Sequence, residues 1–400
     1  MILLIFTLVL ILLIIWLRSK SNLITNNWLT TKRIQTVPED YAMPMTFPEA
    51  SAALVQSGFA PEFIAQNKET IQINIQTVNT LNAQSLEIKK SNPNTNPPKY
   101  GITVASAYTV EEFKNNYLGL KLNPNYASLV SSSQLPSIDP SKIKPSVPSP
   151  NLPIYDQGAC GCCWAVSAST VLNYNLIKKL GNATFITNPL TYVKCLSTDP
   201  QGRFTSQGCN GGDPMDVFNY VNQEKYTIAY QNSLSNLTCP FPGDQVNSKT
   251  CNPQTNCSFV SSATPGSPTN NKVTIDATPT VIPISTDRGT TGIPSKDEIT
   301  KLKFYLSTVG PLVICIDAGT KLREFSVYTG GFTEGPQGSL LPSGTQPDHA
   351  VVLVGYDKDK SGREYWIIQN SWRQTWGIQG LCHSPIDVTG ITYPSTILVR

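Results

Sequence analysis

The chain has 400 residues, of which 40% are hydrophobic and 14% are charged, and its formal net charge is +3. An average soluble protein carries roughly 25% charged residues, so this chain is weakly charged for its size. The small net charge excludes a nucleic-acid binder that works by electrostatics, and the hydrophobic content excludes global disorder. At about 150 residues per domain, the length predicts two or three folding units.

Cysteine and histidine counts limit the chemistry further. The chain has ten cysteines but only two histidines, His349 and His383, so a multi-histidine metal site is excluded. Ten cysteines are compatible with a disulfide framework in an oxidising compartment. The spacing disfavours zinc, because Cys160 and Cys163 have no second close pair to complete four ligands. We therefore expect no metal and no other cofactor.

The N-terminus is an apolar run. Residues 1–17 are interrupted only by Thr7, and this length is at the lower limit for a membrane span. No basic side chain precedes the run and no small-residue cleavage site follows closely, so we favour a single-pass anchor over a cleaved signal sequence. Residues 18–55 are predicted to be a tether.

Orientation signals conflict. The basic residues after the apolar run would hold the rest of the chain in the cytoplasm. The cysteines predict the lumenal or extracellular side instead, which we favour. Three glycosylation sequons fit that side: Asn182, Asn236 and Asn256.

Residues between the tether and the proline-rich region favour helix. After Pro61 the chain contains no proline or glycine up to position 90, and Thr109 with acidic residues behind it is typical of a helix start. Residues 131–150 contain five prolines among many serines, a composition typical of an exposed segment that is open to proteolysis. We place the main domain boundary there.

Three helices and then several strands are predicted after the boundary. The helices are 162–180, which is largely apolar and stops at Gly181, a second that opens at 213–214, and a third over 295–309. Residues 239–294 show no period and are predicted to be loops and short strands. The strands that follow are 312–316, 350–356 and 365–369, with a hairpin turn at 358–362. Helices followed by strands predict an α+β fold of two packed subdomains with a cleft between them.

Three residues suggest nucleophilic catalysis. Cys163 begins the apolar helix, where backbone N–H groups and the helix dipole lower a thiol pKa and favour thiolate. His349 heads one predicted strand and is a candidate base, and Asn370 ends the next strand, where it can orient the imidazole. Taken alone, these residues are also compatible with a core thiol and an ordinary surface histidine.

Four strings around these residues resemble the papain family of cysteine proteases. They occur in the family's order: QGACGCCW at 157–164, GCNGG at 208–212, DHAVVLVGY at 348–356 and YWIIQNSW with a later WG over 365–377. The resemblance covers about residues 134–400. It implies a two-lobed peptidase domain over 151–400, with a central helix in a helical lobe and a β-barrel-like second lobe. The nucleophile and histidine are 186 residues apart, against roughly 130–150 in the family, so we expect an insertion near 239–294.

The resemblance implies a role for each site residue. Cys163 would be the nucleophile, and His349 would hold the thiolate as an ion pair and then protonate the leaving amine. Asn370 would fix the imidazole, and the Gln157 side chain with the Cys163 backbone N–H would form the oxyanion hole. These roles imply a cysteine endopeptidase that hydrolyses peptides or proteins.

The resemblance also implies the substrate-binding residues and one disulfide. Cys160 would pair with Cys209, and Cys195 would pair with one of three cysteines in the insertion, Cys239, Cys251 or Cys257. An acidic residue in the pocket, Asp213, would tolerate basic or polar substrate side chains. The substrate-binding set is Gly211, Gly212, Asp213, Pro214, Cys315, Pro347 and Trp372.

Several positions depart from the family pattern. Cys162 stands where the family usually has Ser, and Arg373 stands where it usually has Gly. Without the nucleophile nine cysteines remain, so at least one is unpaired, and we expect Cys162 or Cys315. A disulfide between Cys162 and Cys163 would switch the enzyme off, although such a ring is strained.

Upstream residues resemble the family's inhibitory propeptide. The similar positions are Asn74, Val78 and Asn82, then Tyr100-Gly-Ile-Thr and Glu111-Glu-Phe; the Glu and Arg that usually precede them are not found at the expected places. We predict an inhibitory propeptide over 56–125 and an activation linker with the mature N-terminus over 126–150. The protein would then be a monomeric zymogen inhibited by its own propeptide.

Three other functions remain as alternatives. A non-catalytic homologue would act as a binding or scaffold protein, and a transglutaminase-like enzyme would transfer acyl groups to amines. The second usually pairs histidine with Asp, so Asn370 disfavours it. A carboxydipeptidase needs paired histidines in a cleft-blocking loop, whereas His383 lies far from the insertion and is predicted to be a surface residue.

Overall fold

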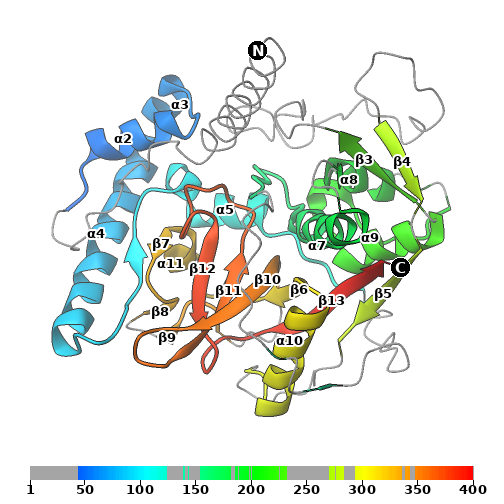
Figure 1. Cartoon of the computed structure of the whole chain (residues 1–400). Helices are drawn as coiled ribbons and strands as arrows, with labels where there is room; N and C mark the ends of the chain where they lie inside the picture. Colours follow the sequence, from blue (N-terminus) through cyan, green and yellow to red (C-terminus); the bar gives the residue numbers. More distant parts are fainter. Residues whose placement is uncertain are drawn as a thin grey trace, which may run out of the picture. The chain divides into compact units, whose positions relative to one another are not determined.

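Figure 1 shows the computed structural model of the chain. The structure describes residues 44–123, 138, 139, 143, 154–181, 185–187, 189–197, 199, 201–224, 226–231, 270–274, 276–282, 293–335, 338–342 and 347–399. The predicted anchor, most of the tether and linker, the three sequons and the three cysteines of the insertion lie outside these residues. Within the described part of the chain, no helix is long and apolar enough to cross a membrane.

The N-terminal segment, residues 44–123, is mainly helical. The tether prediction is wrong for residues 47–55, because Thr46 and Glu49 form a capping box and three side chains of the helix are buried. The helix predicted after Pro61 is divided at Asn67, whose side chain donates to the Phe63 carbonyl at 2.8 Å. The elements of the N-terminal segment are α2 (Phe47–Gln56), α3 (Pro61–Gln66), α4 (Lys68–Ser91), β1 (Lys99–Tyr100), η1 (Val104–Ala107) and α5 (Val110–Tyr117).

Two asparagines on α4 hold the chain that follows it. Asn74 donates to the carbonyls of Ser106 and Tyr108 at 3.1 and 2.9 Å. Asn82 exchanges two hydrogen bonds with the backbone of Tyr100, at 2.9 and 3.0 Å. The spacing that resembles the family propeptide is therefore one helix face that binds backbone groups.

The helical part of the chain after the predicted boundary is built around one buried helix. α7 (Cys163–Leu180) ends at Gly181, which is left-handed with φ 65°, as the sequence predicts. The other elements here are α8 (Pro189–Ser197), η3 (Gly208–Asn210) and α9 (Pro214–Glu224), with a sheet of β2 (Phe185–Thr187), β3 (Tyr226–Gln231) and β4 (Asn270–Thr274).

The strand-rich part is an antiparallel sheet in the order β12-β11-β10-β6-β13-β5 (Figure 1). The three predicted strands are confirmed, and the hairpin turn closes through the Gly362 N–H and the Asp359 carbonyl at 3.0 Å. The strands are β5 (Ala277–Val281), β6 (Leu312–Ile316), β10 (His349–Lys358), β11 (Glu364–Gln369), β12 (Leu381–Pro385) and β13 (Thr392–Val399). The remaining elements are α10 (Lys296–Thr308), α11 (Leu322–Ser326), β7 (Tyr328–Gly330), β8 (Glu334–Gly335) and β9 (Gly338–Ser339).

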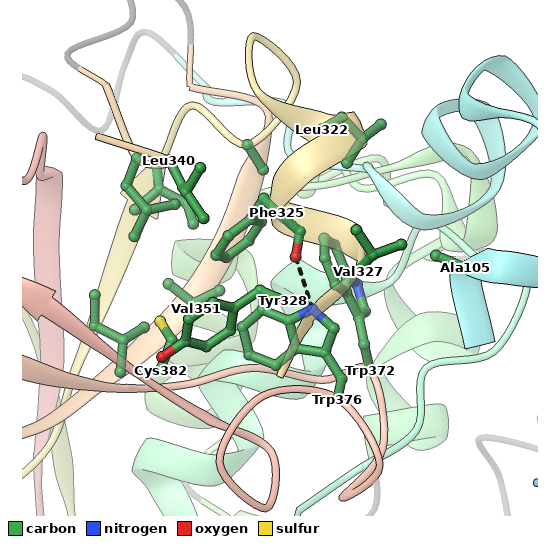
Figure 2. Close-up of a cluster of buried hydrophobic side chains, with 14 of the residues drawn as sticks. Ala105, Leu322, Phe325, Val327, Tyr328, Leu340, Val351, Trp372, Trp376 and Cys382 are labelled. Atoms are coloured by element: carbon green, nitrogen blue, oxygen red, sulfur yellow. Dashed lines mark hydrogen bonds between the residues drawn. The ribbon is translucent and has the colours of Figure 1, made fainter. Parts of the chain in front are cut away.

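A shared core joins the N-terminal segment to the sheet. One cluster of buried side chains runs from α2 and α4 through η1 to β10 and the tryptophans after β11. Figure 2 shows part of it, where the Trp376 indole N–H donates to the Phe325 carbonyl at 2.9 Å beside Trp372. β1 also pairs with β7, Lys99 opposite Gly330. The α+β class is confirmed, and the N-terminal segment is an integral part of the fold.

Candidate active site

Cys163 is the first residue of α7 and is completely buried. The sequence predicts a lowered thiol pKa, and this expectation is wrong for the covered site. Burial raises the pKa of Cys163 to about 11, and the backbone groups of Ala350, Gly119 and Trp164 oppose the rise only in part. The helix N-terminus therefore favours thiolate, but the loss of hydration outweighs it.

His349 and Asn370 meet at adjacent strands, β10 and β11. The His349 Nε2 and the Asn370 Oδ1 are 2.8 Å apart, and the Trp372 ring stacks on the imidazole with centroids 4.9 Å apart. Burial lowers the pKa of His349 to about 4, and the hydrogen bond to Asn370 opposes this shift. The buried Nδ1 has no hydrogen-bond partner among the described residues. When the ring proton is on Nε2, Nδ1 carries a lone pair that can accept a proton.

Gln157 lies in the loop before α7 and is buried. Its Nε2 donates to the Tyr117 and Cys160 carbonyls at 2.8 and 2.9 Å. Its Oε1 accepts from the Ser371 hydroxyl at 2.5 Å. The amide is thus held from both ends, with its donor directed at the N-terminal segment.

The predicted disulfide between Cys160 and Cys209 is present and joins this loop to η3. The disulfide between Cys162 and Cys163 is not formed; the Cys162 Sγ lies 3.9 Å from the Gln157 carbonyl. Cys315 is a buried thiol, and so is Cys382, which sequence reasoning did not single out. The Cys195 side chain lies outside the described residues.

The N-terminal segment crosses the site as an extended strand. The Gly212 N–H donates to the Gly119 carbonyl and the Lys121 N–H to the Gly212 carbonyl, both at 2.9 Å. The Leu120 N–H donates to the Asp348 carbonyl at 3.1 Å. A side chain at Gly211 would meet the Gly119 carbonyl oxygen at 2.7 Å, so glycine permits this close approach, as the sequence predicts.

Asp213 lies under the end of this strand. It accepts from the Asn123 and Met215 N–H groups at 2.7 and 2.8 Å. Burial raises the pKa of Asp213 to about 7 against the effect of these two bonds. Burial also raises the pKa of the Cys315 thiol, and the Asp213 carboxylate adds to this rise. Of the other predicted pocket residues, Pro214 opens α9 and is buried, and Pro347 is half-buried before β10.

Three polar residues of the site were missed by sequence reasoning. Asp348 accepts from the Ala318 and Gly319 N–H groups at 2.9 and 3.0 Å, and burial raises its pKa to about 6. Ser371 holds the Gln157 amide, and Asp156 forms an ion pair with Arg373. Each is adjacent to a predicted site residue, which is the only sequence signal for them. No group of acidic, histidine or cysteine side chains within the described residues has the arrangement of a metal site.

The site thus joins a thiol at a helix N-terminus to an imidazole and a carboxamide on adjacent strands. Residues 145–389 match the domain family described as papain family cysteine protease. Because this match includes more than half of the chain, the chain belongs to the papain family of cysteine proteases.

Individual relatives agree with this assignment. The chain is 30% identical over 227 residues to cathepsin L of Sarcophaga peregrina, a match to 57% of this chain and 53% of that one. It is 29% identical over 311 residues to cysteine proteinase COT44 of Brassica napus, a match to 75% of this chain and 78% of that one. The chain therefore spans about half the length of the cathepsin L relative that it matches.

Solved proforms share the fold. Digestive procathepsin L 3 of Tenebrio molitor larval midgut has a TM-score of 0.59 and 20% identity, over 88% of this chain and 99% of that one. The recombinant stem bromelain precursor has a TM-score of 0.55 and 18% identity, over 87% and 99%. The structural matches cover 88% and 87% of this chain, more than the residues 145–389 that match the family. The structural likeness therefore extends into the N-terminal segment.

Proposed function

We propose that the chain is the zymogen of a cysteine endopeptidase whose catalytic residues are Cys163, His349, Asn370 and Gln157. The observation that carries the proposal is the 2.8 Å contact between His349 and Asn370, which leaves a buried Nδ1 without a partner among the described residues. A lone pair in that state is suited to take the thiol proton.

The reaction then follows from these groups. Cys163 transfers its proton to the His349 Nδ1, and the thiolate attacks the carbonyl carbon of the scissile bond. The Gln157 amide and the Cys163 backbone N–H stabilise the negative oxygen of the tetrahedral intermediate. The imidazolium protonates the leaving amine, and water, deprotonated by the imidazole, hydrolyses the thioester. Asn370 keeps the ring oriented, while Trp372 covers its hydrogen bond from water.

Residues 44–123 act as the inhibitory propeptide in this proposal, slightly longer than the predicted 56–125. Tyr117 supplies a carbonyl to the Gln157 donor, and Gly119 lies against the nucleophile loop. Burial also favours the neutral thiol and the neutral imidazole. The propeptide thus occupies the oxyanion donor and suppresses the ion pair, and release of the segment after cleavage within 126–150 relieves both effects.

Substrates would replace the propeptide strand. Gly212, with both backbone groups bonded to residues 119–121, would pair with a substrate backbone in the same way. Asp213, beside Cys315, would make the neighbouring pocket accept basic or polar side chains. Peptide-library profiling tests this point, and strict rejection of Lys and Arg in that pocket contradicts it.

The cellular setting completes the proposal. The disulfide between Cys160 and Cys209 supports an oxidising compartment. We place the peptidase domain as a glycosylated monomer on the lumenal or extracellular side, held by residues 1–17 as a single-pass anchor. Carbonate extraction of membranes tests the anchor: release of the full chain into the supernatant contradicts it.

The decisive experiment compares two neighbouring thiols. After the linker is cleaved, an epoxide thiol probe labels the wild type, and the processed enzyme cleaves internal bonds of a peptide. Cys163→Ala abolishes labelling and hydrolysis, whereas Cys162→Ala, the matched control for loss of a buried thiol, keeps both. Undiminished hydrolysis by Cys163→Ala contradicts the proposal, and a processed wild type that neither labels nor hydrolyses supports the inactive binding homologue.

A further inference from the structure

Arg373 is the position where this chain departs from the family's usual glycine, and its backbone is left-handed with φ 67°. A side chain other than glycine is strained in this region of backbone space. The guanidinium makes contacts that offset the strain: Nε donates to the Asp156 carboxylate, and Nη1 donates to the Ser57 carbonyl. Ser57 lies 316 positions earlier in the sequence, within the N-terminal segment.

Ser57 is a suitable partner because it ends helix α2. Its own N–H and the Phe59 N–H are bonded to the α2 carbonyls of Ala53 and Leu54, and Gly58 turns the chain with φ 94°. The carbonyl end of a helix carries partial negative charge, and α2 has no basic residue in its last turn. Arg373 supplies that cation from the peptidase domain. Its Cζ also lies 6.0 Å from the Phe59 ring centroid.

We propose that Arg373 and Asp156 form an exosite that binds the helix end at residues 57–59, separately from the strand at 117–123 that covers the catalytic residues. The chain between these two places contains α3, α4, β1, η1 and α5. The inference rests on the proposed function in one respect, that residues 44–123 are the propeptide.

The exosite adds an attachment to the β1–β7 pairing and the shared core, which also hold the segment. When residues 117–123 leave the nucleophile, the exosite keeps the segment at high effective concentration, so the strand rebinds. After the linker is cut, the exosite still keeps the segment near the nucleophile, because the contact at residues 57–59 does not involve the linker. The exosite therefore prolongs inhibition beyond what the shared core and the β1–β7 pairing give. Asp156 precedes Gln157 and Arg373 follows Trp372, so the exosite is adjacent to the catalytic loops.

The test uses the full chain and Arg373→Gly. Glycine suits the left-handed backbone, so the variant is expected to fold. Amide hydrogen exchange across residues 47–59 should become at least about tenfold faster, because a charged hydrogen bond to the helix end is lost. Alkylation of Cys163 by iodoacetamide in the uncleaved chain should rise several-fold.

Arg203→Gly is the matched control. Arg203 is more exposed than Arg373, but its guanidinium also has acidic partners, Asp199 and Glu224, in the helical part of the domain. The Arg203→Gly variant should leave amide hydrogen exchange at residues 47–59 unchanged. Equal exchange in Arg373→Gly and the wild type, or equal acceleration in both variants, overturns the exosite. A processed wild type that hydrolyses no peptide overturns the proposed function instead, and the exchange experiment still decides whether Arg373 binds the helix end.

Discussion

The two halves of the site respond in opposite directions to the same cover. Cys163, on the helical side, has its thiol pKa raised to about 11 by burial, and His349, on the strand side, has its imidazole pKa lowered to about 4. Both shifts favour the uncharged form, because burial penalises whichever form carries charge. From about pH 4 to pH 11 the covered site therefore holds a neutral thiol and a neutral imidazole. Inhibition by this segment, as proposed above, would then be electrostatic as well as steric.

The largest expected effect comes from removal of the cover. Cleavage and release of residues 44–123 should raise the rate of Cys163 alkylation at pH 7 by about 100-fold or more, since each unit of thiol pKa changes the thiolate fraction about tenfold. Iodoacetamide kinetics on the uncleaved and processed chains, from pH 5 to 10, measure this difference. In the uncleaved chain the rate should still be rising at pH 10. A plateau below pH 8 in the uncleaved chain would show that the cover does not control the pair.

The strand side should be nearly as sensitive. Asn370→Ala removes the acceptor at the His349 Nε2 and should lower kcat/KM of the processed enzyme about 30- to 100-fold, the loss expected for a hydrogen bond to a group that becomes charged. Asn175→Ala is the control, since Asn175 is also a buried asparagine, and its side chain donates within its own helix to the Val171 carbonyl at 3.1 Å. A loss in kcat/KM no larger than that of Asn175→Ala would remove Asn370 from the catalytic set.

The parts of the site were not equally predictable from the sequence. Helix ends obey local rules, so the start of α10 at Ser295 and the stop of α7 at Gly181 were predictable within a few residues of chain. The two strands beside His349 were also predictable from their composition and the turn between them. The contacts that hold the predicted covering segment were not, because their key groups are backbone carbonyls, which the sequence does not distinguish. The Tyr117 carbonyl at Gln157 and the Ser57 carbonyl at Arg373 are both of this kind.

Asp213 tests whether burial beneath the strand at 117–123 also shifts the pKa of a carboxyl. Burial raises its pKa to about 7, whereas an Asp in an unfolded chain titrates near 4. Between these values the folded chain holds a proton that the unfolded chain has lost, so the free energy of unfolding falls as pH rises from about 4 to 7. Asp213→Asn removes this dependence, and its stability relative to the parent should be greater at pH 8 than at pH 4 by about 4 kcal/mol.

Denaturant unfolding of the uncleaved chain measures this difference, with Cys163→Ala in both proteins to prevent self-cleavage. Asp387→Asn is the control, because that carboxylate is largely exposed. A difference between Asp213→Asn and its parent that stays constant from pH 4 to pH 8 would mean that Asp213 is ionised in the folded chain.

The smallest expected effect concerns the fit of the covering strand over the nucleophile loop. A Cβ atom at Gly119 would clash with the Gly161 carbonyl oxygen, and neither backbone can move freely because the Gly161 N–H is bonded to Cys209 at 3.0 Å. Gly119→Ala should therefore lift the strand and raise alkylation of Cys163 in the uncleaved chain about tenfold, still below the rate after removal of the whole segment. Gly330→Ala is the matched control, since Gly330 pairs with Lys99 of the same segment and a Cβ there would only touch the Lys99 side chain at 3.7 Å. Equal rates in Gly119→Ala and the unsubstituted chain would mean that the strand covers Cys163 without this close contact.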